Sequence, residues 1–182
     1  MKHHRGIALL GLLLTIVALV ALVPLATCQQ HPSARDEVVM PTTAVPGQLA
    51  SHLEATLTAQ PDDAETLVVL ADLYAHTGRI RDAIPLFEKA IQLRPDDLTV
   101  RLSYAQALLA NGYLADAGAQ LRHALELSPE NPQVLYLLGQ VAERRSPPDL
   151  AAARNWYERA ARAGDDPYAR LARQRLQELA QP

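Results

Sequence analysis

A period of 34 residues is the feature of this sequence that most constrains its fold. The segment GRIRDAIPLFEKAIQLRPDD at residues 78–97 returns in altered form as GYLADAGAQLRHALELSPEN at residues 112–131. The two copies align at glycine, apolar and proline positions, among them Gly78 with Gly112, Phe87 with Leu121, and Pro95 with Pro129. A fixed period of this length indicates one supersecondary unit repeated along the chain.

Each period contains two helical patterns. Proline recurs at residues 61, 95 and 129, and because proline cannot continue a helix interior, each one marks a junction between helices. Apolar residues at helical spacing predict two amphipathic helices in the first unit. The apolar face of the first helix consists of Leu67, Leu70, Ala71 and Tyr74, and that of the second consists of Ala83, Phe87, Ala90 and Ile91. From residue 48 onward we expect an all-α domain.

The arrangement of small and large residues resembles the tetratricopeptide repeat family. The resemblance covers residues 67–95 and 101–129. Two positions depart from the family pattern: Leu67 replaces the usual tryptophan, and Arg101 places a charge where a large apolar residue is common. The third unit also resembles Sel1-like repeats, through Trp156-Tyr157 and Ala160-Ala161. The resemblance implies a right-handed superhelical stack of antiparallel helix pairs, a solenoid.

The domain boundaries follow from the period. We expect the repeat domain to span residues 48–182. Its three repeats are expected at residues 64–97, 98–131 and 132–166, and its two flanking helices at residues 48–60 and 167–180. The flanking helices are expected to cover the ends of the stack, where a solenoid otherwise exposes its core.

The N-terminal residues 1–28 are expected to form a signal or membrane anchor. An apolar run from Ile7 to Val23 follows Lys2 and Arg5, and this charge bias predicts that the rest of the chain lies outside the cytoplasm, in the periplasm or at the cell surface. The sequence LATC, which ends at Cys28, resembles a lipoprotein processing box. Thr27 departs from the Gly, Ala or Ser that such boxes usually carry just before the cysteine. A retained transmembrane helix, a lipid on Cys28 and a cleaved signal all remain open.

Residues 29–47 contain three prolines among polar residues and no regular period. We expect a flexible linker between the anchor and the domain. Beyond residue 28 the chain has 20 acidic and 15 basic residues, and this mildly acidic balance argues against a nucleic-acid partner.

The sequence offers little for catalysis. Three aspartate pairs, at residues 62–63, 96–97 and 165–166, fall where helices begin, so we interpret them as helix caps rather than as acid–base pairs. The histidines have no second ligand at helical spacing, and the chain has neither a phosphate-binding loop nor a nucleophile elbow. We expect no enzyme activity, cofactor, metal site or small-molecule substrate.

The first helices of the repeats carry the predicted binding groove. In peptide-clamping members of the family, Lys and Asn side chains there hold a terminal carboxylate, and the matching positions here lack them. The predicted partner-binding residues are Val68, Val69, Asp72, Leu102, Ser103, Gln106, Tyr136, Leu137 and Gln140. Five of them suggest an apolar floor with neutral amides, unless the C-terminal helix buries it: Val69, Leu102, Gln106, Tyr136 and Gln140.

The preferred hypothesis is a non-catalytic, membrane-tethered interaction module that binds an apolar peptide or helical segment of a partner protein. Residues 48–84 are also similar to the tetratricopeptide domains of c-type cytochrome biogenesis proteins. That resemblance implies an accessory role in cytochrome maturation, holding apocytochrome or haem-lyase tails. A structural lipoprotein subunit of an envelope assembly is the third alternative.

Overall fold

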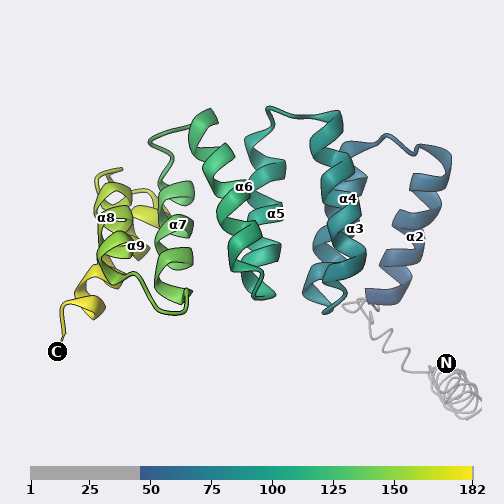
Figure 1. Ribbon diagram of the computed structural model, residues 1–182. Coiled ribbons are helices and arrows are strands. Elements are labelled where there is room, and N and C mark those ends of the chain that lie inside the picture. Colours follow the sequence, from purple (N-terminus) through teal and green to yellow (C-terminus); the bar gives the residue numbers. More distant parts are fainter. Residues whose placement is uncertain (1–45, 182) are drawn as a thin grey trace, which may run out of the picture. The chain divides into compact units, whose positions relative to one another are not determined.

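The computed structural model describes residues 46–181, in which every regular element is an α-helix (Figure 1). The helices are α2 (Pro46–Ala59), α3 (Ala64–His76), α4 (Ile80–Leu93), α5 (Leu98–Ala110), α6 (Leu114–Leu127), α7 (Pro132–Arg144), α8 (Leu150–Ala161) and α9 (Pro167–Leu179). The all-α prediction is confirmed for this part of the chain.

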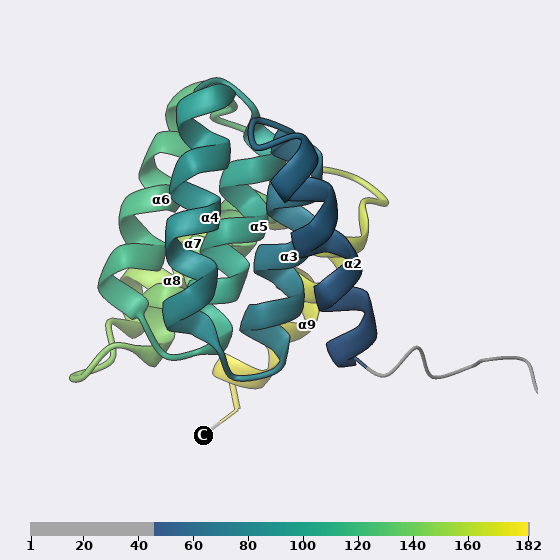
Figure 2. The same ribbon diagram turned by 90° about the vertical axis from the view of Figure 1, so that its right-hand side faces the viewer.

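Consecutive helices form antiparallel pairs, with α3 against α4, α5 against α6 and α7 against α8 (Figures 1 and 2). The flanking helix α2 packs on α3, and α9 packs on both α8 and α7. The three helix pairs thus lie between α2 and α9 along the chain.

The first helix begins earlier than the sequence suggested. The predicted linker extended to residue 47, but α2 already includes Pro46 and Gly47. Proline suits the first position of a helix, because its fixed φ is helical and the missing N–H would have no partner there. The predicted anchor, most of the predicted linker and Cys28 lie outside the described residues.

Large side chains of one helix pack against small residues of its neighbours. Phe87 and Leu121, one period apart, are both fully buried among the same core side chains. The Phe87 ring also stacks on that of Tyr104 with 4.9 Å between centroids. In the third pair the buried ring of Tyr157 takes the space above Gly139, where an added Cβ would lie 2.6 Å from Cδ1 of Tyr157.

The helix ends match the residues placed there. Asp63, Asp97 and Asp166 are N-caps whose side chains accept hydrogen bonds from backbone N–H groups of the next turn, which confirms that one residue of each aspartate pair caps a helix. Gly78 and Gly112 adopt φ of 80° and 84° in the turns between paired helices. Side chains with a Cβ rarely adopt this conformation.

Candidate functional site

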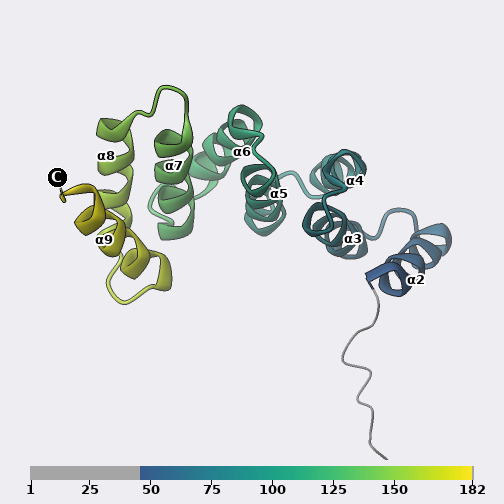
Figure 3. The same ribbon diagram turned by 90° about the horizontal axis from the view of Figure 1, so that it is seen from below.

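The first helices α3, α5 and α7 carry the predicted groove residues, and the side they form is called the inner face here. Helices α3 and α5 lie side by side, with α4 and α6 on the opposite side of the stack (Figure 3). The 34-residue register makes Asp72, Gln106 and Gln140 equivalent. All three are partly exposed, so the same position of each repeat presents a polar side chain.

Two apolar residues of the predicted groove belong to the hydrophobic core instead. Leu102 is 7% exposed and Leu137 is 4% exposed, and both pack within the main cluster of buried side chains. Adjacent first helices lie close together, so a large side chain directed between them is covered. Assigning Leu102 and Leu137 to a contact surface was therefore wrong. Val69, by contrast, is 44% exposed.

A pocket of about 280 Å³ opens between α3 and α5 and is called the α3–α5 pocket. Its lining combines one carboxylate, one histidine, neutral polar groups and alanine methyls, from Asp72, Ala75, His76, Ser103, Gln106, Ala107, Ala110 and Asn111. The pocket thus brings together three of the predicted residues, namely Asp72, Ser103 and Gln106.

Asp72 is the charged centre of this pocket. Burial raises the pKa of its carboxyl, and the positive charge of His76 opposes that rise. His76 forms a hydrogen bond to the backbone carbonyl of Asp72, at 2.7 Å through Nδ1, rather than to the carboxylate. Among residues 46–181, no lysine, arginine or histidine forms an ion pair with Asp72.

Asn111 holds the two walls of the α3–α5 pocket together. Its Nδ2 donates to the carbonyl oxygen of Ala107 at 2.9 Å and to that of Ala75 at 3.3 Å. One side chain therefore bridges the C-terminal ends of α5 and α3. This bridge links the two helices that line the pocket.

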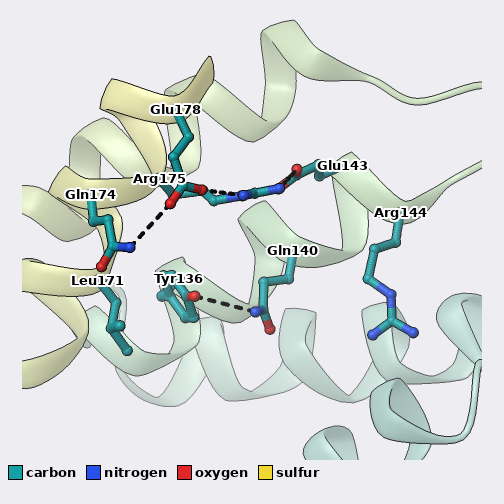
Figure 4. A pocket seen from close by; sticks show the side chains of 8 residues that line it. All are labelled: Tyr136, Gln140, Glu143, Arg144, Leu171, Gln174, Arg175 and Glu178. Carbon is teal, nitrogen blue, oxygen red and sulfur yellow. Dashed lines mark hydrogen bonds and ion pairs between the residues drawn. The ribbon is translucent and has the colours of Figure 1, made fainter. Parts of the chain in front are cut away.

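A second pocket, of about 270 Å³, lies between α7 and α9 and is called the α7–α9 pocket (Figure 4). Its charges are largely paired, because Arg175 of α9 contacts both Glu143 of α7 and Glu178. Arg175 Nε donates to Glu143 Oε2 at 3.0 Å, and the Tyr157 hydroxyl donates to the same oxygen at 2.9 Å. These hydrogen bonds lower the pKa of Glu143, so the carboxylate is held ionised between three helices.

Tyr136, another predicted groove residue, is partly covered by α9. Its ring lies 5.8 Å from that of Tyr168 and 5.5 Å from that of Tyr157, centroid to centroid. Its hydroxyl accepts a hydrogen bond from Gln140 Nε2 at 3.3 Å (Figure 4). At this end of the inner face, the alternative that the C-terminal helix covers the groove describes Tyr136 well.

Sequence reasoning missed several residues of both pockets. His76 and Asn111 line the first pocket, and a signal existed for Asn111, which directly precedes the turn residue Gly112. Glu143 and Arg175 dominate the second, but they are 32 residues apart and belong to no repeated motif. No sequence pattern pointed to that pair.

The described residues add two findings on other kinds of site. Within residues 46–181, no helix has the length and apolarity needed to cross a membrane. In the same residues, no three His, Cys, Asp or Glu side chains cluster closely enough to hold a metal ion.

Comparison with known proteins supports the repeat assignment. Residues 46–166, about two thirds of the chain, match the family model described as "Cytochrome c-type biogenesis protein H TPR domain". The chain is 33% identical over 162 residues to the cytochrome c-type biogenesis protein CycH of Rhizobium meliloti (strain 1021), with 76% of this chain and 42% of that protein covered. It is 27% identical over 130 residues to BBSome complex member bbs-4 of Caenorhabditis elegans, covering 69% and 28%. The chain thus spans less than half the length of either relative.

Solved structures of MamA have a similar fold. One crystal structure superposes with a TM-score of 0.58 at 22% identity, covering 73% of this chain and 82% of that chain. A second MamA structure, AMB-1, gives a TM-score of 0.57 at 25% identity, covering 66% and 70%. The family match extends from α2 to the residues just after α8. The chain therefore belongs to the family of the cytochrome c-type biogenesis protein H TPR domain, a protein-interaction module built of tetratricopeptide repeats.

Proposed function

We propose that this chain is a non-catalytic accessory protein of c-type cytochrome maturation that binds a segment of a partner polypeptide on its inner face. The family match over residues 46–166 is the observation that carries this proposal. The similarity to CycH of Rhizobium meliloti, whose name describes cytochrome c-type biogenesis, points to the same process. Apocytochrome c and the tail of a haem lyase are the candidate partners.

The inner face has the chemistry of a polypeptide-binding surface. The exposed Val69 offers apolar contact, while Ser103, Gln106 and Gln140 offer neutral hydrogen-bonding groups. Apolar contacts supply most of the affinity of such a surface, and the polar groups fix the orientation of the bound segment. The buried Leu102 and Leu137 support the surface from below.

We further propose that the domain acts outside the cytoplasmic membrane, tethered by residues 1–28. The support is Lys2 and Arg5 ahead of the apolar run, an arrangement that keeps the N-terminal side in the cytoplasm. In permeabilised cells, externally added protease is expected to digest the domain. Digestion that requires a broken inner membrane would contradict this orientation.

The binding proposal is tested with the full-length chain in lipid nanodiscs and fluorescently labelled apocytochrome c. We expect saturable binding, and Ser103→Arg is expected to weaken it at least tenfold, because a bulky cation then fills the α3–α5 pocket. The matched control is Gln92→Arg, which adds the same charge at an exposed position of α4. Equal binding by wild type and Ser103→Arg would move the binding surface elsewhere, and no binding by the wild type would remove apocytochrome c as the partner.

A structural lipoprotein subunit of an envelope assembly is the second candidate function. The observation that favours it is the lipoprotein-like LATC sequence ending at Cys28. Metabolic labelling with a radioactive fatty acid distinguishes the two forms of attachment. Label that is present in the wild type and absent in Cys28→Ser would establish a lipid anchor, whereas an unlabelled wild type would exclude it.

A further inference from the structure

We infer that the α3–α5 pocket is a subsite for a basic side chain, lysine or arginine, of the bound polypeptide, with the carboxylate of Asp72 as its counter-ion. The identity of the polypeptide rests on the proposed function. The cation specificity rests on the pocket itself.

Asp72 differs from the helix-capping and ion-paired carboxylates of the domain. Asp63 and Asp97 cap helices, and Glu143 is paired with Arg175. Asp72 is neither a cap nor a member of an ion pair within residues 46–181. It is nevertheless partly buried, and burial penalises its charged form. A carboxylate that is partly desolvated and has no ion-pair partner in the described residues is suited to binding a cationic group of a ligand.

The surroundings of Asp72 are mostly neutral. Helix α5 faces Asp72 with Ser103, Gln106 and Asn111, which are all neutral. The other titratable group of the pocket is His76, on the same helix as Asp72, and its ring nitrogen is engaged with a backbone carbonyl. A ligand cation would therefore meet one carboxylate, and His76 is the one basic side chain in the lining of this pocket.

The shape of the pocket also suits a basic side chain. A pocket of about 280 Å³ with methyl groups from Ala75, Ala107 and Ala110 in its lining can take a long aliphatic stem. Lysine and arginine combine such a stem with a charged end, and they commonly bury the stem while the charge reaches a polar group. The hydroxyl of Ser103 and the amide of Gln106 can accept further hydrogen bonds from the cation.

The test measures whether the charge of the probe and the charge of Asp72 act together. Full-length wild type and Asp72→Asn are titrated with apocytochrome c in three forms: unmodified, lysine-acetylated, and arginine-modified with cyclohexanedione. Close charge pairs across an interface couple strongly, so one modification is expected to weaken wild-type binding at least tenfold. The same modification is expected to change binding to Asp72→Asn less than twofold.

Asp96→Asn is the matched control, because it removes the same charge from an exposed residue outside the pocket. Its sensitivity to modification is expected to equal that of the wild type. The modification that loses its effect in Asp72→Asn identifies the bound side chain as lysine or arginine. Equal effects of both modifications on wild type and Asp72→Asn would overturn the inference while leaving apocytochrome binding intact.

A second measurement decides the inference even when the wild type does not bind apocytochrome c, which would count against the proposed function alone. The probes are the Nα-acetyl methylamides of lysine, arginine and Nε-acetyl-lysine, and the readout is the side-chain amide NMR signals of Gln106 and Asn111. A cationic probe is expected to shift these signals in the wild type and not in Asp72→Asn, while Nε-acetyl-lysine is expected to shift them in neither. Identical responses of wild type and Asp72→Asn, including no response, would overturn the cation subsite.

Discussion

The α3–α5 pocket and the α7–α9 pocket use their charges in opposite ways. In the α7–α9 pocket, Arg175 binds Glu143 and Glu178, and Tyr157 completes the network. In the α3–α5 pocket, Asp72 has no ion-pair partner among residues 46–181. The first set of charges joins α9 to the stack, whereas the second leaves a carboxylate free for a ligand.

This difference separates a structural polar cluster from a candidate binding site. A partly buried ionised group costs free energy unless it is paired and hydrogen-bonded. Glu143 is paired and hydrogen-bonded within the protein, and its pKa is lowered. Asp72 has no such ion pair among the described residues, and its pKa is raised. Two pockets of similar size on the same repeat scaffold therefore have different roles.

The largest expected effect concerns the scaffold that both pockets share. Phe87→Ala should lower the free energy of unfolding by about 3 to 5 kcal/mol, because a fully buried ring is lost and a cavity remains. Leu121→Ala, one period later, should cost about 2 to 5 kcal/mol, because a fully buried aliphatic side chain is lost and a cavity remains. Urea unfolding followed by circular dichroism measures both. A loss of less than about 1 kcal/mol in either variant would contradict the equivalent core roles.

The next effect separates core from inner face. Leu102→Glu should lower the free energy of unfolding by about 3 kcal/mol, because it places an unpaired carboxylate in the core. Gln106→Glu adds the same charge at a partly exposed position and serves as the control, with an expected change below about 1 kcal/mol. Thermal denaturation compares the two. Equal stability of Leu102→Glu and Gln106→Glu would mean that Leu102 is part of the exposed inner face and not of the core.

A smaller effect is expected from breaking the paired charges. Arg175→Ala should cost about 1 to 3 kcal/mol, since it leaves the half-buried carboxylate of Glu143 with only the Tyr157 hydroxyl. Arg144→Ala is the matched control, because Arg144 lines the same pocket but forms no ion pair with residues 46–181 (Figure 4). Denaturant unfolding should show little change for Arg144→Ala. A similar loss of stability in both variants would mean that the positive charge of the pocket, and not the ion pairs of Arg175, stabilises the packing of α9.

The smallest effect is a pH dependence of opposite sign in the two pockets. Because the folded pKa of Asp72 is raised, its charge reduces stability as the pH rises above the unfolded value of 3.8. Asp72→Asn should therefore be more stable than wild type at pH 7, by less than about 1 kcal/mol, and this advantage should vanish near pH 3.

For Glu143 the sign is reversed. Its folded pKa is lowered, so its stabilising contribution is present above the unfolded value of 4.5 and is lost as the pH falls through the folded pKa. Denaturant unfolding of wild type, Asp72→Asn and Glu143→Gln at pH 7 and pH 3 measures both trends. A stability loss for Asp72→Asn at pH 7 would mean that Asp72 has a structural partner after all.

Local patterns in the sequence were sufficient for the helices and their junctions. The 34-residue period, through the resemblance to tetratricopeptide repeats, predicted the antiparallel pairs. The three aspartate pairs predicted the N-caps of α3, α5 and α9, because capping depends only on residues within one turn. Gly78 and Gly112 recur one period apart, and the structure shows both in turns with positive φ, a conformation that also depends on local sequence. These predictions required no knowledge of how distant helices pack.

Burial and pairing on the inner face were decided by the tertiary structure. Periodicity placed Leu102 and Asp72 on the first helices, but only the approach of neighbouring helices buried Leu102 and formed a pocket around Asp72. Glu143 and Arg175 meet across α7 and α9 because the C-terminal helix folds back on the third pair. The sequence by itself thus determined which helices form. Only their packing decided which charges the fold neutralises, because that depends on contacts between residues far apart in the chain.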